Sequence, residues 1–374
     1  YLAGMNGEAE RALEFVQRAM ENLPEEDWAA RTHVLNIHGL ALQYQGDFFE
    51  ATRSFEAALA VGKKVGRVHE LLYTSSNLAY AQLLQGHLRE AFSMCQIAVY
   101  KTEEVHQSSQ RFPVLAHAYA TKSNILLEWN ELESAVSLAR QAVALAEQWG
   151  QADALNYAMS CLSQALGAAG EFEEAFAVNQ QAMKVTGTIS PWYARISAEN
   201  EIMLLLAKGD LTAAAKKYEC CFSTAEEDRN DRTLYMEVSL LYQQNQYLDV
   251  INKINPTLDD LQQKGWNLLW IKLLPIYALS LQALGRTEEA LQVLERCLAA
   301  AEPEGFMRMF VEGGAPMASL LKNLQNRGVR VDYITKLLAA FHLPEEAPKP
   351  GKSSSAPARS AVTDLVEPLS EREL

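Results

Sequence analysis

The stretch "LQGHLREA", Leu84 to Ala91, contains the pattern that decides the fold, a glycine with an alanine five residues later. The pattern returns as "MNGEAERA" (5–12), "YQGDFFEA" (44–51), "AAGEFEEA" (168–175), "AKGDLTAA" (207–214) and "ALGRTEEA" (283–290), and with Asn in place of Gly as "EWNELESA" (128–135) and "QQNQYLDV" (243–250), the last also with Val in place of Ala. The Gly or Asn of successive copies is 36 to 44 residues apart. Because these residues tolerate the left-handed backbone that ends a helix, each copy predicts a helix, a tight turn and a second helix.

Small residues flank most of the turns at fixed distances. Five residues after the turn residue lie Ala12, Ala51, Ala91, Ala135, Ala175, Ala214, Val250 and Ala290. Seven residues before it lie Gly39, Ala79, Ser123, Ser163, Ile202, Val238 and Ala278. Small side chains on facing helices allow a close approach, so the pattern predicts tightly packed helix pairs.

The composition fits a helical array and excludes several functions. Of 374 residues, 49% are hydrophobic, and 33 basic against 47 acidic residues give a net charge of −14 without a dense Lys/Arg cluster, so we expect no DNA binding by this segment. No apolar run is long enough to span a bilayer and no secretion leader opens the chain, which favours a soluble, cytoplasmic protein. The five cysteines form no C-x-x-C pair, which argues against a disulfide framework or a zinc site.

The repeats resemble the tetratricopeptide (TPR) family, which places Gly, Gly/Asn, Ala and Ala at these offsets. The usual period of that family is 34 residues, so steps near 40 indicate longer helices. The array weakens after Glu302, and "PMASLLKNLQ" (316–325) and "VDYITKLLAAFHL" (331–343) predict two closing helices. The expected fold is therefore all-α: a TPR-like superhelix of about eight helix-turn-helix units with C-terminal capping helices over residues 1–344.

Beyond this array, residues 345–364 form a Pro/Ser-rich stretch that predicts a linker. The final "PLSEREL" (368–374) has the Ser-x-x-Glu pattern of a capping box, with Ser370 and Glu373, and predicts the start of a new helix. We expect residues 365–374 to be the first residues of a further domain that is truncated here. The chain begins at Tyr1, so we also expect it to be a piece of a longer protein.

The stretch "EGFMRMFVEGGAPMASLL" (304–321), with Gly305, Phe306, Met317, Leu320 and Leu321, occurs together with "PLSEREL" in the order found in MalT-like regulators of the LuxR type. That resemblance implies three parts: an N-terminal ATP-binding switch domain, a TPR-like superhelix that receives an inducer, and a C-terminal helix-turn-helix domain that binds DNA. This chain would be the middle part, followed by the first residues of the DNA-binding domain. ATP binding and DNA binding would belong to absent parts, and the full-length protein would self-associate.

The family resemblance also implies which residues face the concave surface, namely those 13, 10 and 6 positions before each turn residue. The polar, charged and aromatic members that we select as candidate ligand-binding residues are His33, Asn36, Tyr73, Tyr80, His117, Asn124, Tyr157, Ser160, Gln164, Glu199, Arg232, Tyr235 and Lys272. Rings supply contact area and amides fix orientation, so this set suits a polar organic ligand or a peptide. The earlier units favour a neutral ligand, whereas the later, charged units favour an anion.

Two functions of different classes follow. The first is an inducer-sensing domain of a transcriptional activator. The alternative is a TPR scaffold that binds a peptide or partner protein, with Arg232 and Lys272 clamping a carboxylate. No catalytic constellation, metal-ligand set or cofactor motif can be assembled, so an enzyme is not expected, and ATP is expected only for the absent N-terminal domain.

Overall fold

The helices follow the predicted alternation. The computed structural model describes residues 9–66, 68–105, 112–222 and 231–341. The first helices of the units are α3 (Trp28–Gln45), α5 (Val68–Leu84), α7 (Ala116–Glu128), α9 (Ala152–Ala168), α11 (Pro191–Lys208), α13 (Asp231–Gln243) and α16 (Asn267–Ala283). The second helices are α2 (Ala9–Asn22), α4 (Phe48–Val65), α6 (Leu88–Val105), α8 (Leu132–Trp149), α10 (Phe172–Val185), α12 (Leu211–Phe222), α14 (Tyr247–Ile254) and α17 (Thr287–Ala301).

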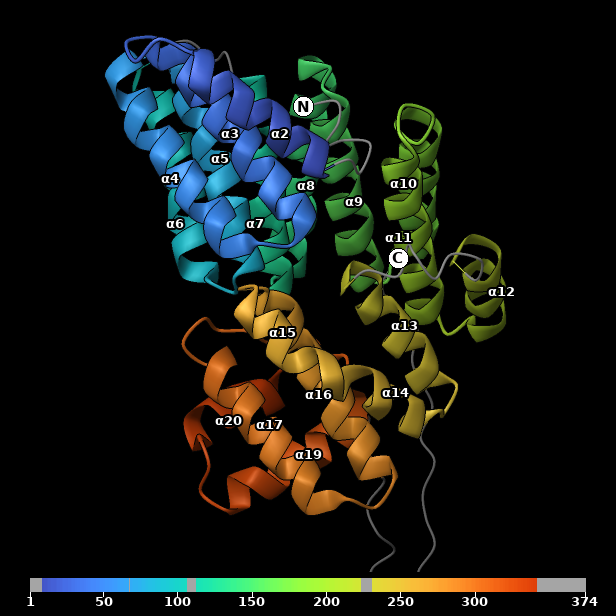
Figure 1. The fold of residues 1–374 in the computed structure, drawn as a ribbon. Helices are drawn as coiled ribbons and strands as arrows, with labels where there is room; N and C mark the ends of the chain where they lie inside the picture. The colour runs from blue at the N-terminus through green and yellow to red at the C-terminus, as the bar shows by residue number, and fades with distance from the viewer. Residues whose placement is uncertain (1–8, 67, 106–111, 223–230, 342–374) are drawn as a thin grey trace, which may run out of the picture. The chain divides into compact units, whose positions relative to one another are not determined.

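Short helices complete this part of the chain: η1 (Pro113–Leu115), η2 (Asn255–Thr257), α15 (Leu258–Gln263), α18 (Arg308–Val311), α19 (Gly314–Asn326) and α20 (Val331–Ala339). The described residues contain helices and no strand, which confirms the all-α prediction, and Figure 1 shows the successive helices packed side by side. The chain divides into a unit of residues 1–341 and a second of residues 342–374. The predicted linker, the "PLSEREL" helix start and the first turn residue, Gly7, lie outside the described residues.

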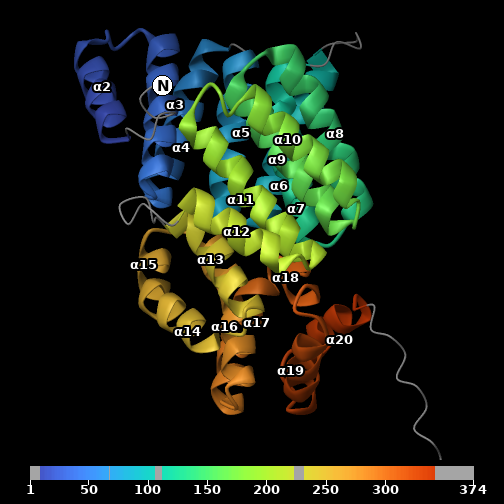
Figure 2. The same cartoon turned by 90° about the vertical axis from the view of Figure 1, so that its right-hand side faces the viewer.

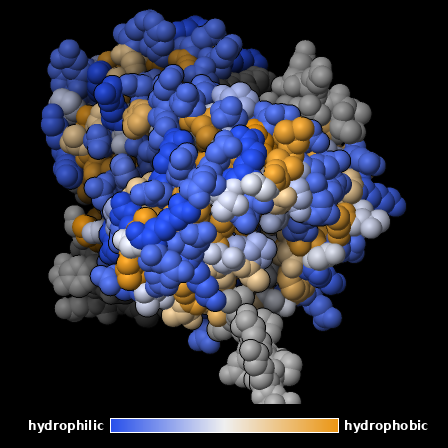
Figure 3. All heavy atoms as spheres, turned by 90° about the horizontal axis from the view of Figure 1, so that it is seen from below, coloured by the Kyte–Doolittle hydropathy of each residue, from blue (hydrophilic) through white to orange (hydrophobic). Residues whose placement is uncertain are grey.

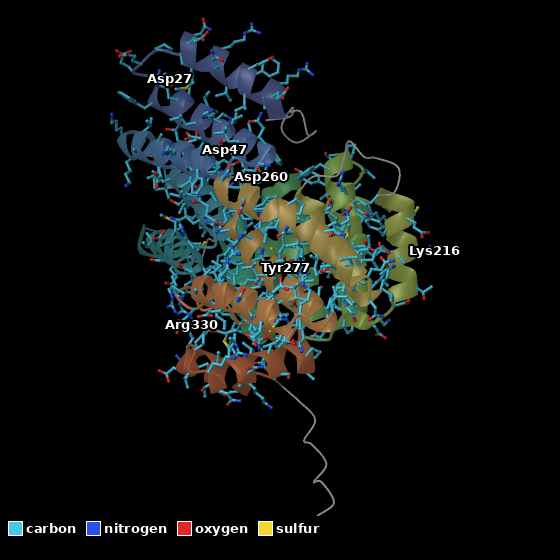
Figure 4. All side chains as sticks on the ribbon, turned by 60° about the horizontal axis from the view of Figure 1, so that its bottom comes forward. Asp27, Asp47, Lys216, Asp260, Tyr277 and Arg330 are labelled. Atoms are coloured by element: carbon cyan, nitrogen blue, oxygen red, sulfur yellow. The ribbon has the colours of Figure 1, made fainter. Side chains whose placement is uncertain are left out.

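The predicted turn residues have the left-handed backbone conformation expected for Gly and Asn at the end of a helix. The seven that the structure describes all have positive φ: Gly46 (89°), Gly86 (79°), Asn130 (63°), Gly170 (83°), Gly209 (84°), Asn245 (61°) and Gly285 (77°). At the first of these turns, Asp47 then begins the next helix. Its Oδ1 accepts a hydrogen bond from the Glu50 N–H at 3.1 Å, and Asp27 caps α3 in the same way through Ala30 N–H (Figure 4).

The small residues beside the turns lie where the paired helices pack closely against each other. All eight residues five positions after a turn are buried, as are the seven residues seven positions before one. A Cβ atom added to Gly39 would lie 2.6 Å from the Phe55 ring. The Ser123 hydroxyl donates to the Ala135 carbonyl at 2.8 Å, so in that unit the two small columns are joined by a hydrogen bond.

One contact was not predicted: the C-terminal part of the array touches the turns of the first three complete units. We call this the return contact, between the turn segments 46–49, 86–89 and 128–130 and residues 264–308. The backbone N–H of Phe48 donates to the Lys264 carbonyl at 3.1 Å, and the indole of Trp129 donates to the Glu304 carbonyl at 2.8 Å. The side-chain hydrogen bonds of the return contact join residues 144 to 215 positions apart.

A buried ion pair lies within the return contact. Lys272 Nζ lies 2.6 Å from Glu128 Oε1 and 5.1 Å from the centre of the Tyr235 ring, and the Glu128 side chain is only 6% exposed. Burial alone would lower the pKa of Lys272, but the charge and hydrogen bond of Glu128, with neighbouring charges, outweigh burial and raise it. Lys272 therefore keeps its positive charge at neutral pH.

The two predicted closing helices are present as α19 and α20, which follow the "EGF" stretch at 304–306 (Figure 2). Gly305 has φ of +79°, and Phe306 is fully buried beneath these helices, where its carbonyl accepts a hydrogen bond from the Tyr333 hydroxyl. This stretch therefore joins the capping helices to the array.

In the part of the chain that the structure describes, no helix has the length and apolar character needed to cross a membrane. Figure 3 shows hydrophilic residues over most of the face that it presents, with hydrophobic residues in separate small patches.

Candidate ligand-binding site

A cavity of about 320 Å³ lies along the first helices α3, α5, α7, α9 and α11. It is of a size typical of small-molecule sites. Its polar and aromatic lining residues are Gln43, Tyr44, Phe48, Asn77, Tyr80, His117, Asn124, Asp153, Asn156, Tyr157, Ser160, Gln164, Trp192, Tyr193, Arg195, Glu199, Asn200 and Trp266. Trp266 packs against Phe48, with ring centroids 5.0 Å apart, so the cavity borders the return contact.

Seven of the thirteen candidate residues line this cavity: Tyr80, His117, Asn124, Tyr157, Ser160, Gln164 and Glu199. Three more lie in the early units but not at the cavity. His33 is exposed, and Asn36 is buried between helices, where its Nδ2 donates to Thr74 Oγ1 at 2.8 Å. The Tyr73 ring packs edge-on against Trp149, with centroids 5.9 Å apart.

The later candidates belong to another region. Tyr235 and Lys272 pack around Glu128 in the return contact and do not line the cavity. Arg232 is in α13, but its side chain lies outside the described residues. Lys272, one of the two residues of the proposed cation clamp, is therefore paired with Glu128 and does not line the cavity.

Aromatic rings form much of the cavity wall. The His117 ring stacks on Tyr157 with centroids 5.7 Å apart, and Tyr80 meets Tyr157 edge-on at 4.9 Å. Burial raises the pKa of Tyr157 well above its usual value, so its phenol remains protonated. Tyr44 and Trp192 meet edge-on at 5.6 Å, which links the first complete unit to the fifth.

Four buried polar atoms at this cavity lack a hydrogen-bond partner among the described residues. They are His117 Nε2, Ser160 Oγ, Tyr193 Oη and Asn200 Nδ2. Asn200 Oδ1 accepts from Gln164 Nε2 at 2.8 Å, which leaves Nδ2 as a donor. Because buried polar groups in proteins are normally paired, these four atoms can form hydrogen bonds with a molecule or with water in the cavity.

Sequence reasoning missed several lining residues, among them Asp153, Trp192, Tyr193 and Asn200. Asp153 and Trp192 both lie 17 positions before their turn residue, and Asn200 lies 9 before, as does Asn77. These offsets continue the helical stripe one turn further and broaden it by one residue. A search along the whole stripe, and not only at three offsets, would have included them.

We predict that Tyr193→Phe leaves the stability of the ligand-free chain unchanged to within about 0.5 kcal/mol, because the lost hydroxyl has no protein partner among the described residues. Tyr218→Phe is the matched control, since the Tyr218 hydroxyl donates to the buried Glu237 carboxylate at 2.7 Å. Its loss should cost about 1.5 kcal/mol. Urea unfolding measures both; equal losses would show that the Tyr193 hydroxyl is paired in the folded state.

The repeats, their turns and their helix pairing define a TPR-type helical-repeat protein. The sequence matches the MalT-like TPR region family over residues 1–327. The chain therefore belongs to this family.

Comparison with curated proteins gives no match. Among solved structures, the chain is similar to a tetratricopeptide repeat protein from Parabacteroides merdae ATCC 43184, with 13% identity and a TM-score of 0.40 over 83% of this chain and 98% of that one.

Proposed function

We propose that this chain is the effector-sensing domain of a MalT-like transcriptional regulator of the LuxR type, and that the cavity holds a small polar organic effector. The observation that carries the proposal is the group of four buried polar atoms at one aromatic-walled cavity. Membership of the MalT-like family supports it. The role is binding rather than catalysis, in a cytoplasmic protein whose ATP-binding and DNA-binding domains are separate from this array.

The regulatory step follows from differential affinity. An effector activates the regulator only if it binds the DNA-competent state more tightly than the inactive one. The cavity is lined by helices of five successive units and by Trp266, which comes from the far end of the array. A change in the relative position of these helices changes the shape of the cavity. Binding of an effector in the cavity is therefore coupled to the arrangement of the helices.

A peptide-binding scaffold remains the alternative, but no observation favours it. Its expected cation clamp included Lys272, which is paired with Glu128. A cavity of about 320 Å³ among the first helices suits a small molecule better than an extended chain.

The test uses the full-length regulator with ATP and promoter DNA. We expect at least one compound in a broad metabolite panel to strengthen promoter binding, and Ser160→Ala and Tyr193→Phe to weaken that response about tenfold without changing the melting temperature of the ligand-free protein. The exposed Asp259→Asn on α15 is the control and should respond as the parent does. No response to any compound, or equal responses in all variants, would remove the effector role from this cavity.

The LuxR-type assignment has a separate test. The gene sequence that follows the codon for Leu374 should encode a helix-turn-helix domain. An unrelated sequence there would contradict the transcription role. The cavity would then be the ligand-binding site of a protein other than a transcriptional regulator.

A further inference from the structure

A carboxylate and several rings lie together at one part of the cavity. We call Asp153, Tyr44, Trp192 and Tyr193 the Asp153 cluster; its members come from α9, α3 and α11, and all four line the cavity. The Asp153 side chain is 19% exposed. Tyr193 is nearly fully buried, at 3% exposure, and Tyr44 meets Trp192 edge-on.

The charge of Asp153 acts on the surrounding phenols. Burial raises the pKa of Tyr193 and of Tyr73, and the negative field of Asp153 raises both further. The field of Tyr44 contributes at both sites as well. These groups from four helices are therefore close enough to interact electrostatically, with the carboxylate among them.

The lining as a whole favours positive charge. Its Asp, Glu, Arg and His side chains are Asp153, Glu199, Arg195 and His117. Arg195 Nε lies 3.4 Å from Glu199 Oε1, so that pair offsets itself, and His117 Nε2 lies 3.8 Å from Asp153 Oδ2. The described lining carries two carboxylates, Asp153 and Glu199, and one guanidinium, Arg195, and this excess of carboxylate favours a cation over an anion.

The faces of Tyr and Trp rings also attract cations, and rings around a cationic nitrogen are the usual protein site for organic ammonium ions. A neutral polyol gains hydrogen bonds here but nothing from the field of the carboxylate. We propose that the effector is an organic ammonium ion whose charged nitrogen lies among the rings of the Asp153 cluster, facing the Asp153 carboxylate. This deepens the proposed function and rests on the cavity being the effector site.

The experiment titrates the whole chain, by calorimetry, with two cations and their neutral analogues. The pairs are choline with the alcohol in which carbon replaces its nitrogen, and benzylamine with benzyl alcohol. At least one cation should bind about tenfold or more tightly than its neutral analogue. In Asp153→Asn, which preserves shape and removes the charge, that ratio should fall to near one.

Two further variants keep the test decisive if Asp153→Asn does not fold. Trp192→Leu removes a ring face but no charge, and should weaken cation binding several-fold more than binding of the alcohol. Asp259→Asn removes an exposed carboxylate from α15 and should leave the ratio unchanged. Melting curves confirm that each variant is folded.

The inference is overturned if neither cation binds, if the alcohols bind as tightly as the cations, or if Asp153→Asn keeps the ratio of the parent. If a neutral compound binds and Tyr193→Phe weakens it while the cations show no advantage, the effector site stands and only the ammonium assignment fails. If cations bind with the expected ratio but the full-length protein shows no change in promoter binding with any compound, the ligand class stands and the regulatory role fails.

Discussion

Replacing Lys272 by methionine is expected to lower the free energy of unfolding by about 3 kcal/mol or more. The substitution leaves the Glu128 carboxylate, whose side chain is 6% exposed, without the ammonium that lies 2.6 Å away. Arg286→Met, which breaks the exposed ion pair between Arg286 and Glu289, is expected to have a much smaller effect, because solvent screens that pair. Urea unfolding followed by circular dichroism measures both.

The double variant Glu128→Gln with Lys272→Met separates the cost of an unpaired charge from a loss of packing. Removing both charges should recover most of the stability, because an apolar or neutral pair avoids the desolvation of two ions. A double variant as unstable as the single one would show that packing by the Lys272 side chain, over the Tyr235 ring, is the larger contribution.

Phe306→Ala is expected to cost about 4 kcal/mol, since it removes a fully buried ring and leaves a cavity beneath the closing helices. The matched control is Phe15→Ala on α2, where the ring is 51% exposed and the cost should stay below about 1 kcal/mol. Guanidinium unfolding measures the difference. Similar losses in the two variants would contradict the role of the "EGF" stretch as the buried link between α18–α20 and the array.

The helix pairs and their turns could be predicted from the sequence because each unit repeats the same local pattern of residues. A glycine or asparagine in the left-handed region and a small residue on each side of the turn are requirements of neighbouring positions, so they recur at a fixed spacing. The closing helices were predicted for the same reason, since their apolar spacing and the break at Gly328 are local.

The site was only partly predictable. The inward stripe of each first helix follows from helical spacing, which is why Tyr80, Tyr157 and Ser160 line the cavity. Where the cavity lies along the array depends on which helices approach one another, and that depends on the curvature accumulated over several units. Asn36 and Lys272 both belong to the predicted inward positions, 10 and 13 residues before their turn residues, yet one is bonded between two helices and the other is paired in the return contact.

The return contact has a consequence for how this domain evolves and folds. In an ordinary repeat array each unit touches only its neighbours, so units are gained and lost freely and folding spreads along the chain. Here the segment at 264–308 must meet the turns at 46–49, 86–89 and 128–130, so inserting or deleting one unit between them would displace every partner. The number of units is therefore fixed, and the last contacts to form in folding join residues far apart in the sequence.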